Sequence, residues 1–327
     1  SEAVRGEGGY LLNNKGERFM ANYAPSKMEL APRDVVAKAI ETEIAEGRGF
    51  GKGLDAYVVA DVRHLPKEVI LEKLHGIREL AITFEHADPL TQPIPIRPTC
   101  HYSMGGIDVV DYKSCGTVVP GLFAAGEAAC VSVHGANRLG GNSLADAVVF
   151  GKVAGEGAID YVKNNSAKDA KKALSEAATA WETRFREVTG RKDGRPIAEI
   201  RDEMANAMWN KVGIFREESK MQEALATINK LIEEYKTCYV GDTNRTFNMA
   251  FVNYVEVGSL LTVAKAVVMG ALRRQESRGS HLREDYTKRD DAKFLNHTLI
   301  TLKEDGEYEV GQRDVVVTRF EPKERTY

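Results

Sequence analysis

One glycine-rich stretch in the middle of the chain has the residue types that bind an anionic ligand carrying hydroxyl groups. The apolar run 118–125 predicts a buried strand that ends at a glycine, and Glu127 directly after it offers a carboxylate to a ligand hydroxyl. A tight turn with Arg138 follows, and Asn142 or Ser143 then predicts the N-cap of a helix. Free backbone N–H groups and the positive end of that helix would meet at one point, which suits an anion.

Other basic side chains allow both a structural and a functional interpretation. The segment 30–47 is apolar on one face and predicts a helix that ends at Gly47, with Arg33 at its start. Taken alone, Arg33 is best interpreted as a surface arginine paired with a neighbouring carboxylate. His101 is by the same standard a core histidine between two strands. The sequence assigns no role to His134.

The predicted fold class is α/β plus α, in four parts that position these residues. An α+β capping part, or lid, residues 1–99, precedes a partial α/β nucleotide-binding lobe, residues 100–162. Long helices then predict an antiparallel bundle, residues 163–280, and a small charged region, residues 281–327, ends the chain. Within these parts we expect strands at 57–60 and 315–317, a proline-spaced linker at 91–99, and helices at 66–79, 166–188, 196–212, 217–237 and 247–275.

Composition narrows the classes of function that the chain can have. The net charge is -3 over 327 residues, and basic residues gather in no stretch, so we expect no nucleic-acid binding. No apolar run approaches the ~18 residues of a membrane span, and no signal sequence opens the chain, so we expect membrane contact only through a partner. Its four cysteines lack metal-ligand spacing, so we expect reduced thiols and no metal site.

Three long motifs resemble, in the same order, the flavoprotein subunit of succinate dehydrogenase and fumarate reductase. They are HYSMGGI at 101–107, GLFAAGE at 121–127 and HGANRLGGNSLAD at 134–146. The resemblance extends over the whole chain, including ESRGSHLREDY at 276–286 and the closing RTY. It begins well inside that subunit, and no G-x-G-x-x-G fingerprint is found. We therefore expect the carboxy-terminal part of a larger flavoprotein, whose amino-terminal FAD-binding segment is missing from this chain.

The resemblance implies a proton path as well as an activity. The family interconverts succinate and fumarate by hydride transfer to or from FAD, as part of the tricarboxylic acid cycle and electron transport. The arginine that matches Arg33 gives the proton to substrate carbon and takes it back. Its path runs through an E-x-x-R pair, which Glu2 and Arg5 match. Because arginine is a weak acid, this role needs nearby positive charge and a poorly solvated site.

The resemblance also implies how the substrate is held. His101 and Arg138 match residues that bind substrate carboxylates, and Ser1 stands where the family has a threonine whose hydroxyl contacts a carboxylate. Held at both ends, a dicarboxylate would be oriented for hydride transfer.

For the cofactor, the family implies FAD with several contacts from this chain. Glu127 matches a residue on the hydroxyls of the ribityl or ribose part of FAD, and Asn142, Ser143 and Leu144 match the segment beside the isoalloxazine edge. Arg138 would in addition stabilise negative charge on the reduced flavin.

The resemblance further implies an iron–sulfur subunit as partner and, through it, membrane anchor subunits at the cytoplasmic face of the inner membrane. Two alternatives stay open at this point. An enzyme similar to L-aspartate oxidase shares the HGANRL and NSL motifs. The chain by itself could also be a non-catalytic and inactive piece that is unable to hold FAD.

Overall fold

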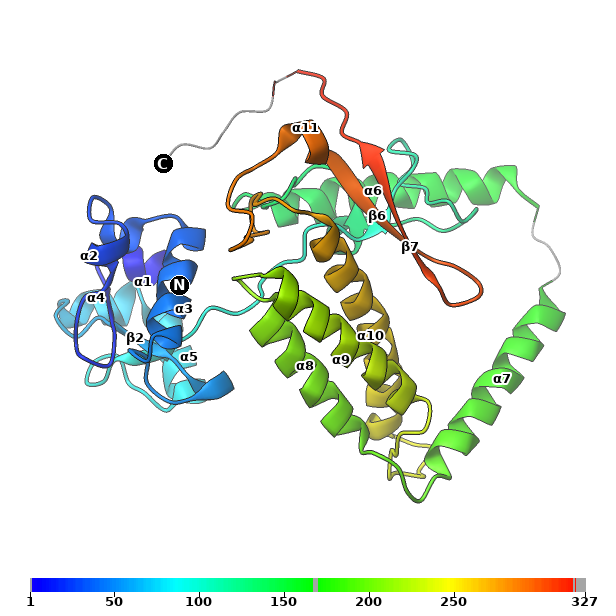
Figure 1. Ribbon diagram of the computed structural model, residues 1–327, viewed down its shortest axis with the longest axis horizontal. Helices are drawn as coiled ribbons and strands as arrows, with labels where there is room; N and C mark the ends of the chain where they lie inside the picture. The colour runs from blue at the N-terminus through cyan, green and yellow to red at the C-terminus, as the bar shows by residue number, and fades with distance from the viewer. Residues whose placement is uncertain (1, 167–169, 320, 322–327) are drawn as a thin grey trace. The chain divides into compact units, whose positions relative to one another are not determined.

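The computed structural model describes residues 2–166, 170–319 and 321, and the chain divides into two compact units, Ser1–His101 and Tyr102–Tyr327 (Figure 1). Each unit has a hydrophobic core of its own. Both units contain helices and strands, which confirms the predicted mixed class. Their interpretation as a capping part and a partial cofactor lobe stays a prediction.

The first unit is built on a small antiparallel sheet. Its strands are β1 (Tyr10–Leu12), β2 (Val58–Asp61) and β3 (Ile94–Ile96), in the order β1-β2-β3. Strand β3 lies inside the segment predicted as a linker, because its residues pair with β2. Helices around the sheet are α1 (Glu2–Gly6), α2 (Met20–Tyr23), α3 (Arg33–Ala45), α4 (Lys67–Glu72) and α5 (His75–Glu85), with one-turn 3-10 helices at Met28–Leu30 and Gly53–Asp55.

Helix α3 is the element that carries Arg33, and it agrees with the prediction. It follows Pro32, buries one stripe of side chains against the core, and ends before Gly47, whose φ is +77°. The single helix predicted over 66–79 is wrong. The chain forms α4 and α5 instead, with a break at Leu74, which is buried in the core.

The second unit begins with the lobe that carries Arg138. Strands β4 (Ile107–Asp108) and β5 (Ala129–Cys130) pair in parallel, a 3-10 helix (Gly126–Ala128) precedes β5, and α6 (Asn142–Asn164) follows. The strand predicted over 118–125 is wrong. Pro120 and Gly121, the latter with φ +83°, turn the chain there, and Val118 is exposed.

The helices predicted at 196–212, 217–237 and 247–275 are confirmed to within a few residues. The helix predicted over 166–188 is confirmed from residue 171 onward, and residues 167–169 of that prediction lie outside the described residues. In the structure these helices are α7 (Lys171–Thr189), α8 (Ile197–Val212), α9 (Glu218–Tyr235) and α10 (Met249–Arg273). Helices α8, α9 and α10 pack on one another, and α10 contributes a buried stripe at alternating steps of three and four residues: Tyr254, Val257, Leu261, Ala264, Val268 and Ala271. By length and composition alone, α10 could cross a membrane, so the sequence-based exclusion missed it. Its buried stripe packs against α8 and α9.

The end of the described chain forms a short helix and a hairpin. Helix α11 (Asp291–Phe294) leads into strands β6 (Asn296–Leu302) and β7 (Tyr308–Asp314), which pair antiparallel from Asn296 opposite Asp314. The strand predicted at 315–317 is wrong, since β7 ends before it and β6 was not expected. The hairpin lies against α10, through which it joins the bundle.

Candidate functional site

In the first unit, the structure brings together the three residues of the predicted proton path. The Arg33 guanidinium donates to the Glu2 carboxylate at 2.7 Å. Arg5, one turn after Glu2 in α1, donates to the carbonyl oxygens of Glu29 and Ala31 at 2.7 and 2.9 Å, just before α3 begins. Two basic side chains thus lie near one carboxylate at the N-terminal end of α3.

The guanidinium of Arg5 is less exposed to water than one on an open surface would be. Burial lowers the pKa of Arg5, the carboxylate of Glu2 opposes that change, and the positive charge of Arg33 adds to it. Arg33 itself keeps 58% of its side chain exposed, so its guanidinium is accessible to a ligand. The predicted pair of Arg33 with a neighbouring carboxylate is therefore present, and it joins two residues of the predicted proton path.

In the second unit, Arg138 lies in the loop 132–141, between β5 and α6; we call this segment the Arg138 loop. Its guanidinium lies over the Tyr102 ring, 4.6 Å from Cζ to the ring centroid, and Nη1 donates to the carbonyl of Leu139 at 2.8 Å. Among the described residues, the buried Nε atom of Arg138 has no hydrogen-bond partner. An arginine held by a ring keeps hydrogen-bonding capacity for a ligand.

Helix α6 begins without the cap that the sequence predicts. Its N-cap is Gly141, with φ +79°, and within the described residues no side chain caps the helix. Asn142 and Ser143 instead stand in the first turn, because the glycine pair reverses the chain one residue earlier. The result is an exposed positive helix end three residues after Arg138.

A cluster of three side chains lies under Arg138, and sequence reasoning missed its members. His134 Nε2 lies 2.9 Å from Asp146 Oδ2, and the Tyr102 hydroxyl donates to the same oxygen at 3.4 Å. Tyr102 and His134 also meet edge to face, with centroids 5.4 Å apart. Asp146 is the buried residue of α6, and a carboxylate on the buried face of a helix was the signal that could have revealed it.

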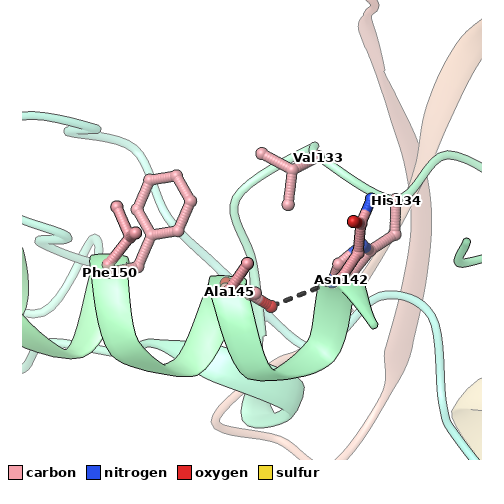
Figure 2. A pocket seen from close by; sticks show the side chains of 7 residues that line it. Val133, His134, Asn142, Ala145 and Phe150 are labelled. Carbon is pink, nitrogen blue, oxygen red and sulfur yellow. Dashed lines mark hydrogen bonds and ion pairs between the residues drawn. The ribbon is translucent and has the colours of Figure 1, made fainter. Parts of the chain in front are cut away.

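A cavity of about 220 Å³ opens beside this cluster (Figure 2). It is lined by Val133, His134, Asn142, Ala145, Asp146, Val149 and Phe150. Two of its polar atoms, His134 Nδ1 and Asp146 Oδ1, are buried and have no hydrogen-bond partner within the described chain. The cavity thus has polar groups toward the Arg138 loop and an apolar wall along α6.

The other residues predicted to contact FAD or the substrate lie at separate positions in the structure. Glu127 is exposed, and its Oε1 accepts a hydrogen bond from the Ser103 N–H at 2.9 Å. Leu144 is exposed on α6. His101 is exposed rather than a core histidine, and it ends the first unit, whereas Arg138 belongs to the second. Ser1 lies outside the described residues.

Models of two protein families match the chain. The FAD binding domain matches residues 1–144, and the carboxy-terminal domain described as fumarate reductase flavoprotein C-term matches residues 201–327. A curated relative from Wolinella succinogenes, the flavoprotein subunit of an 8-methylmenaquinol:fumarate reductase, is 52% identical over all of this chain and 53% of its own length. The chain is similar to the flavoprotein subunits of fumarate reductases and succinate dehydrogenases.

Further relatives show the same similarity. A mitochondrial succinate dehydrogenase flavoprotein subunit from rice is 42% identical over 91% of this chain and 48% of its own length. The solved FrdA of an E. coli quinol fumarate reductase, a mutant, superposes with a TM-score of 0.89 at 37% identity, covering 99% of this chain and 57% of that one. The chain therefore spans about half the length of the curated relatives it matches. None of these matches favours the L-aspartate oxidase alternative.

The cofactor of this family is FAD, and residues of the second unit fit it. Its isoalloxazine edge becomes more negative on reduction, and an uncapped helix end beside an arginine with an unpaired buried Nε suits negative charge. The exposed carboxylate of Glu127 suits a hydroxyl group. All four cysteines are free thiols, and within the described residues no cluster of His, Cys, Asp or Glu could hold a metal ion.

Proposed function

We propose that this chain is the catalytic carboxy-terminal part of a flavoprotein subunit that interconverts succinate and fumarate. In this proposal residues 1–99 cap the substrate, residues 100–162 complete the FAD-binding domain, residues 163–280 form the helical bundle, and residues 281–327 form a small end region. The observation that carries the proposal is the 2.7 Å pair of Arg33 and Glu2 with Arg5 beside it.

The proton step follows from that arrangement. FAD, when bound, supplies the acceptor and donor of the hydride. On fumarate reduction, Arg33 donates a proton to the substrate carbon, and Glu2 returns one to Arg33. Arg5, whose pKa is lowered by burial, then re-protonates Glu2. Succinate oxidation runs the same path in reverse.

The substrate would be held by its two carboxylates. His101 and Arg138 supply the donors, and Ser1 adds a hydroxyl. Fixing both ends of a four-carbon diacid limits the orientations of its central carbons, which is what a hydride transfer needs. Glu127, Asn142, Ser143 and Leu144 would contact FAD, and Arg138 would also face its negative edge.

The names of the relatives support a proposal about the partners of this chain. The Wolinella relative is the flavoprotein subunit of an 8-methylmenaquinol:fumarate reductase. We propose that electrons leave or reach this subunit through an iron–sulfur protein, and that the assembly lies on the cytoplasmic face of the inner membrane through anchor subunits.

Substituting Arg33 in the full-length subunit tests the proposal. We expect Arg33→Gln to lower succinate-dependent dye reduction roughly 1,000-fold, because it removes the acid–base group, while FAD content and malonate binding stay near wild type. Stopped-flow reduction of the bound flavin measures the step directly.

Arg63→Gln is the matched control, since Arg63 is a half-exposed arginine of the same unit that pairs with Asp61 at 2.7 Å. We expect that variant to turn over like wild type. Unchanged turnover in Arg33→Gln, or an equal loss in both variants, would contradict the role of Arg33.

A further inference from the structure

The Arg138 loop is held by a distant part of the chain. Arg278 and His281 exchange two backbone hydrogen bonds, of 2.8 and 3.0 Å, and so close a tight turn over Gly279 and Ser280. We call Arg278–His281 the RGSH turn. Its tip meets the loop, because the backbone N–H and the hydroxyl of Ser280 both donate to the carbonyl oxygen of Ala136, each at 2.9 Å.

The contact leaves no room for a side chain at Gly279. A Cβ atom there would lie 2.5 Å from the carbonyl oxygen of Ala136 and 2.6 Å from its carbon. Gly279 also has a φ of +59°. Both the turn and the close approach therefore require glycine. Ala136 is two residues from Arg138, so a displaced carbonyl would move the guanidinium.

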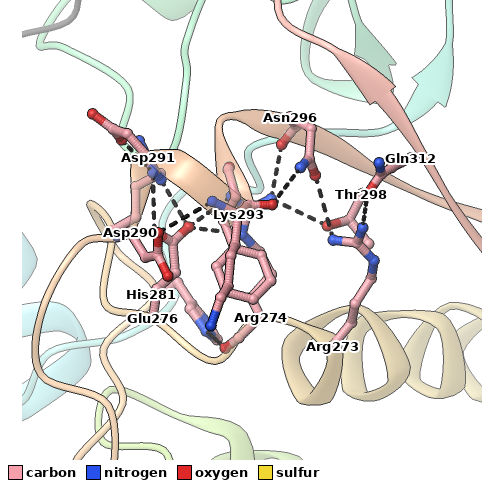
Figure 3. A network of polar contacts seen from close by, with 12 residues as sticks. Arg273, Arg274, Glu276, His281, Asp290, Asp291, Lys293, Asn296, Thr298 and Gln312 are labelled. Carbon is pink, nitrogen blue, oxygen red and sulfur yellow. Dashed lines mark hydrogen bonds and ion pairs between the residues drawn. The ribbon is translucent and has the colours of Figure 1, made fainter.

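A buried polar network fixes the RGSH turn (Figure 3). Glu276 is fully buried and accepts hydrogen bonds from Arg274 at 2.7 Å, from Arg278 at 2.8 and 2.9 Å, and from the Asp290 N–H at 2.9 Å. Burial alone would raise the pKa of Glu276, but these donors outweigh it, and the pKa lies below its usual value. A charged, fully paired carboxylate thus ties the turn to the end of α10 and the start of α11.

The same network also anchors the first residue of the Arg138 loop. His297, on β6, lies 2.8 Å from the Ser132 hydroxyl through its Nε2 atom. Arg274 in turn donates to the carbonyl of Asn296 at 2.9 Å and to the Thr298 hydroxyl at 3.2 Å, which fixes β6. The loop is therefore pinned at Ser132 and at Ala136 by one scaffold.

We propose that the RGSH turn positions Arg138 for its ligand, with Gly279 and Ser280 as positioning residues. This inference rests on the proposed function for the identity of the ligand, a dicarboxylate. The pinning of the loop itself rests only on the contacts described.

The test compares two glycine variants of the full-length subunit. Gly279→Ala places a methyl group against Ala136, whereas Gly306→Ala places one in open space at the tip of the β6–β7 hairpin, where φ is +86°. Both add a side chain at a positive φ, so Gly306→Ala controls for backbone strain. We expect Gly279→Ala alone to speed hydrogen exchange over residues 132–141 and to lower kcat/KM for succinate about 100-fold. Malonate should bind about tenfold more weakly in the same variant.

Equal exchange over residues 132–141 in the two glycine variants would overturn the inference. A wild-type protein that binds no dicarboxylate would instead refute the proposed function, and hydrogen exchange would still report whether the turn pins the loop.

If Gly279→Ala does not fold, Ser280→Ala removes one donor without adding an atom. We expect it to weaken malonate binding about fivefold, with rescue by Ser280→Thr, since one hydrogen bond contributes about 1 kcal/mol. Ser259→Ala on α10 is its control, and equal behaviour of these two serine variants would also overturn the inference.

Discussion

The guanidinium of Arg138 lies over the Tyr102 ring and, within the described part of the chain, forms no ion pair with a carboxylate. Such a contact orients a cation and leaves its charge uncompensated. The Tyr102 ring is itself held by the Asp146 carboxylate and the edge of His134. The cluster therefore sets the direction of a positive charge, which is what a site for an anionic ligand needs.

Two substitutions of Tyr102 distinguish the contribution of its ring from that of its hydroxyl. We expect Tyr102→Leu in the full-length subunit to weaken malonate binding about fivefold, because it removes a cation–π contact of about 1 kcal/mol. Tyr102→Phe keeps the ring and loses only a long hydrogen bond, so it should bind malonate nearly as well as wild type. Titration of the flavin spectrum with malonate measures both. Equal weakening in the two variants would mean that the hydroxyl, not the ring, holds Arg138.

The sequence motifs indicated which charged residues lie close together, but not the residues that pack around Arg138. Glu2, Arg5 and Arg33 were predicted from motifs, and they lie together at the start of α3. Tyr102 and Asp146 were missed because their roles depend on packing across 44 residues of sequence. A local sequence pattern does not predict which face of a helix packs against which loop.

At the scale of elements, α3 is fastened at its far end by a buried carboxylate. Glu43 is 1% exposed and accepts from Arg48 at 2.7 and 2.8 Å, from Asn13 at 2.8 Å and from the Tyr23 hydroxyl at 2.7 Å. The hydrogen bonds from Arg48, opposed by burial and aided by Asn13 and Tyr23, lower the pKa of Glu43 to about 2. The folded state thus prefers the charged carboxylate.

That preference predicts acid sensitivity of the first unit. Glu43 binds a proton more readily in the unfolded chain, so its contribution is complete above pH ~4.5 and is lost as the pH falls toward 2. We expect Glu43→Gln to lower the free energy of unfolding at pH 7 by about 3 kcal/mol, because it leaves Arg48 without its buried partner. Urea unfolding at several pH values measures both effects.

Glu46→Gln is the control, because Glu46 pairs with the same arginine from an exposed position. We expect it to change the unfolding free energy by less than about 1 kcal/mol. Similar losses in both variants would show that burial of Glu43 is unimportant.

His281 makes the second unit sensitive to acid in a different pH range. Its Nδ1 atom accepts from Arg216 at 2.8 Å, so its Nε2–H donates to the carbonyl of Arg274 at 3.0 Å and the ring is neutral. Burial, with the charges of Arg216, Arg283 and Arg274, lowers the pKa of His281 to about 4. Below pH ~6.5, His281 therefore binds a proton in the unfolded chain but not in the folded chain.

We therefore expect the free energy of unfolding to fall by about 3 kcal/mol between pH 6.5 and 4, through His281 alone. His281→Gln cannot titrate and should show a flatter profile there, while the exposed His75→Gln should follow wild type. Hydrogen exchange of residues 276–286 against pH is the measurement. A wild-type slope retained in His281→Gln would contradict the assignment.

Elements were predicted well where periodicity was long and poorly where single residues decide. The helices α8, α9 and α10 carry several turns of regular apolar spacing, which fixed their ends to within a few residues. The run 118–125 looked equally apolar, but Pro120 and Gly121 turn the chain. The N-cap of α6 is likewise Gly141 rather than the predicted Asn142, because Gly141 adopts a left-handed turn conformation and the helix begins directly after it.

At the scale of the whole chain, the lobe that contains α6 exposes several large apolar side chains. On α6, Leu144 and Val148 are 75% and 72% exposed, and Val118 is 76% exposed. The chain also spans about half of its relatives' length. Surface of this kind in one lobe indicates a missing neighbour, since monomeric proteins rarely expose large contiguous apolar patches.

This surface predicts how FAD binding divides between the chain and the full-length subunit. We expect the chain alone to be purified with less than about a tenth of an equivalent of flavin, because a lobe without its neighbour buries too little of a ligand. Val148→Ser should leave the thermal midpoint of the chain alone unchanged, yet lower the FAD content of the full-length protein, where the face is covered. Lys152→Ser, on the same helix, controls for helix propensity and should change neither. Flavin absorbance near one equivalent in the chain alone, or a full-length Val148→Ser protein with full FAD content, would show that α6 needs no further cover.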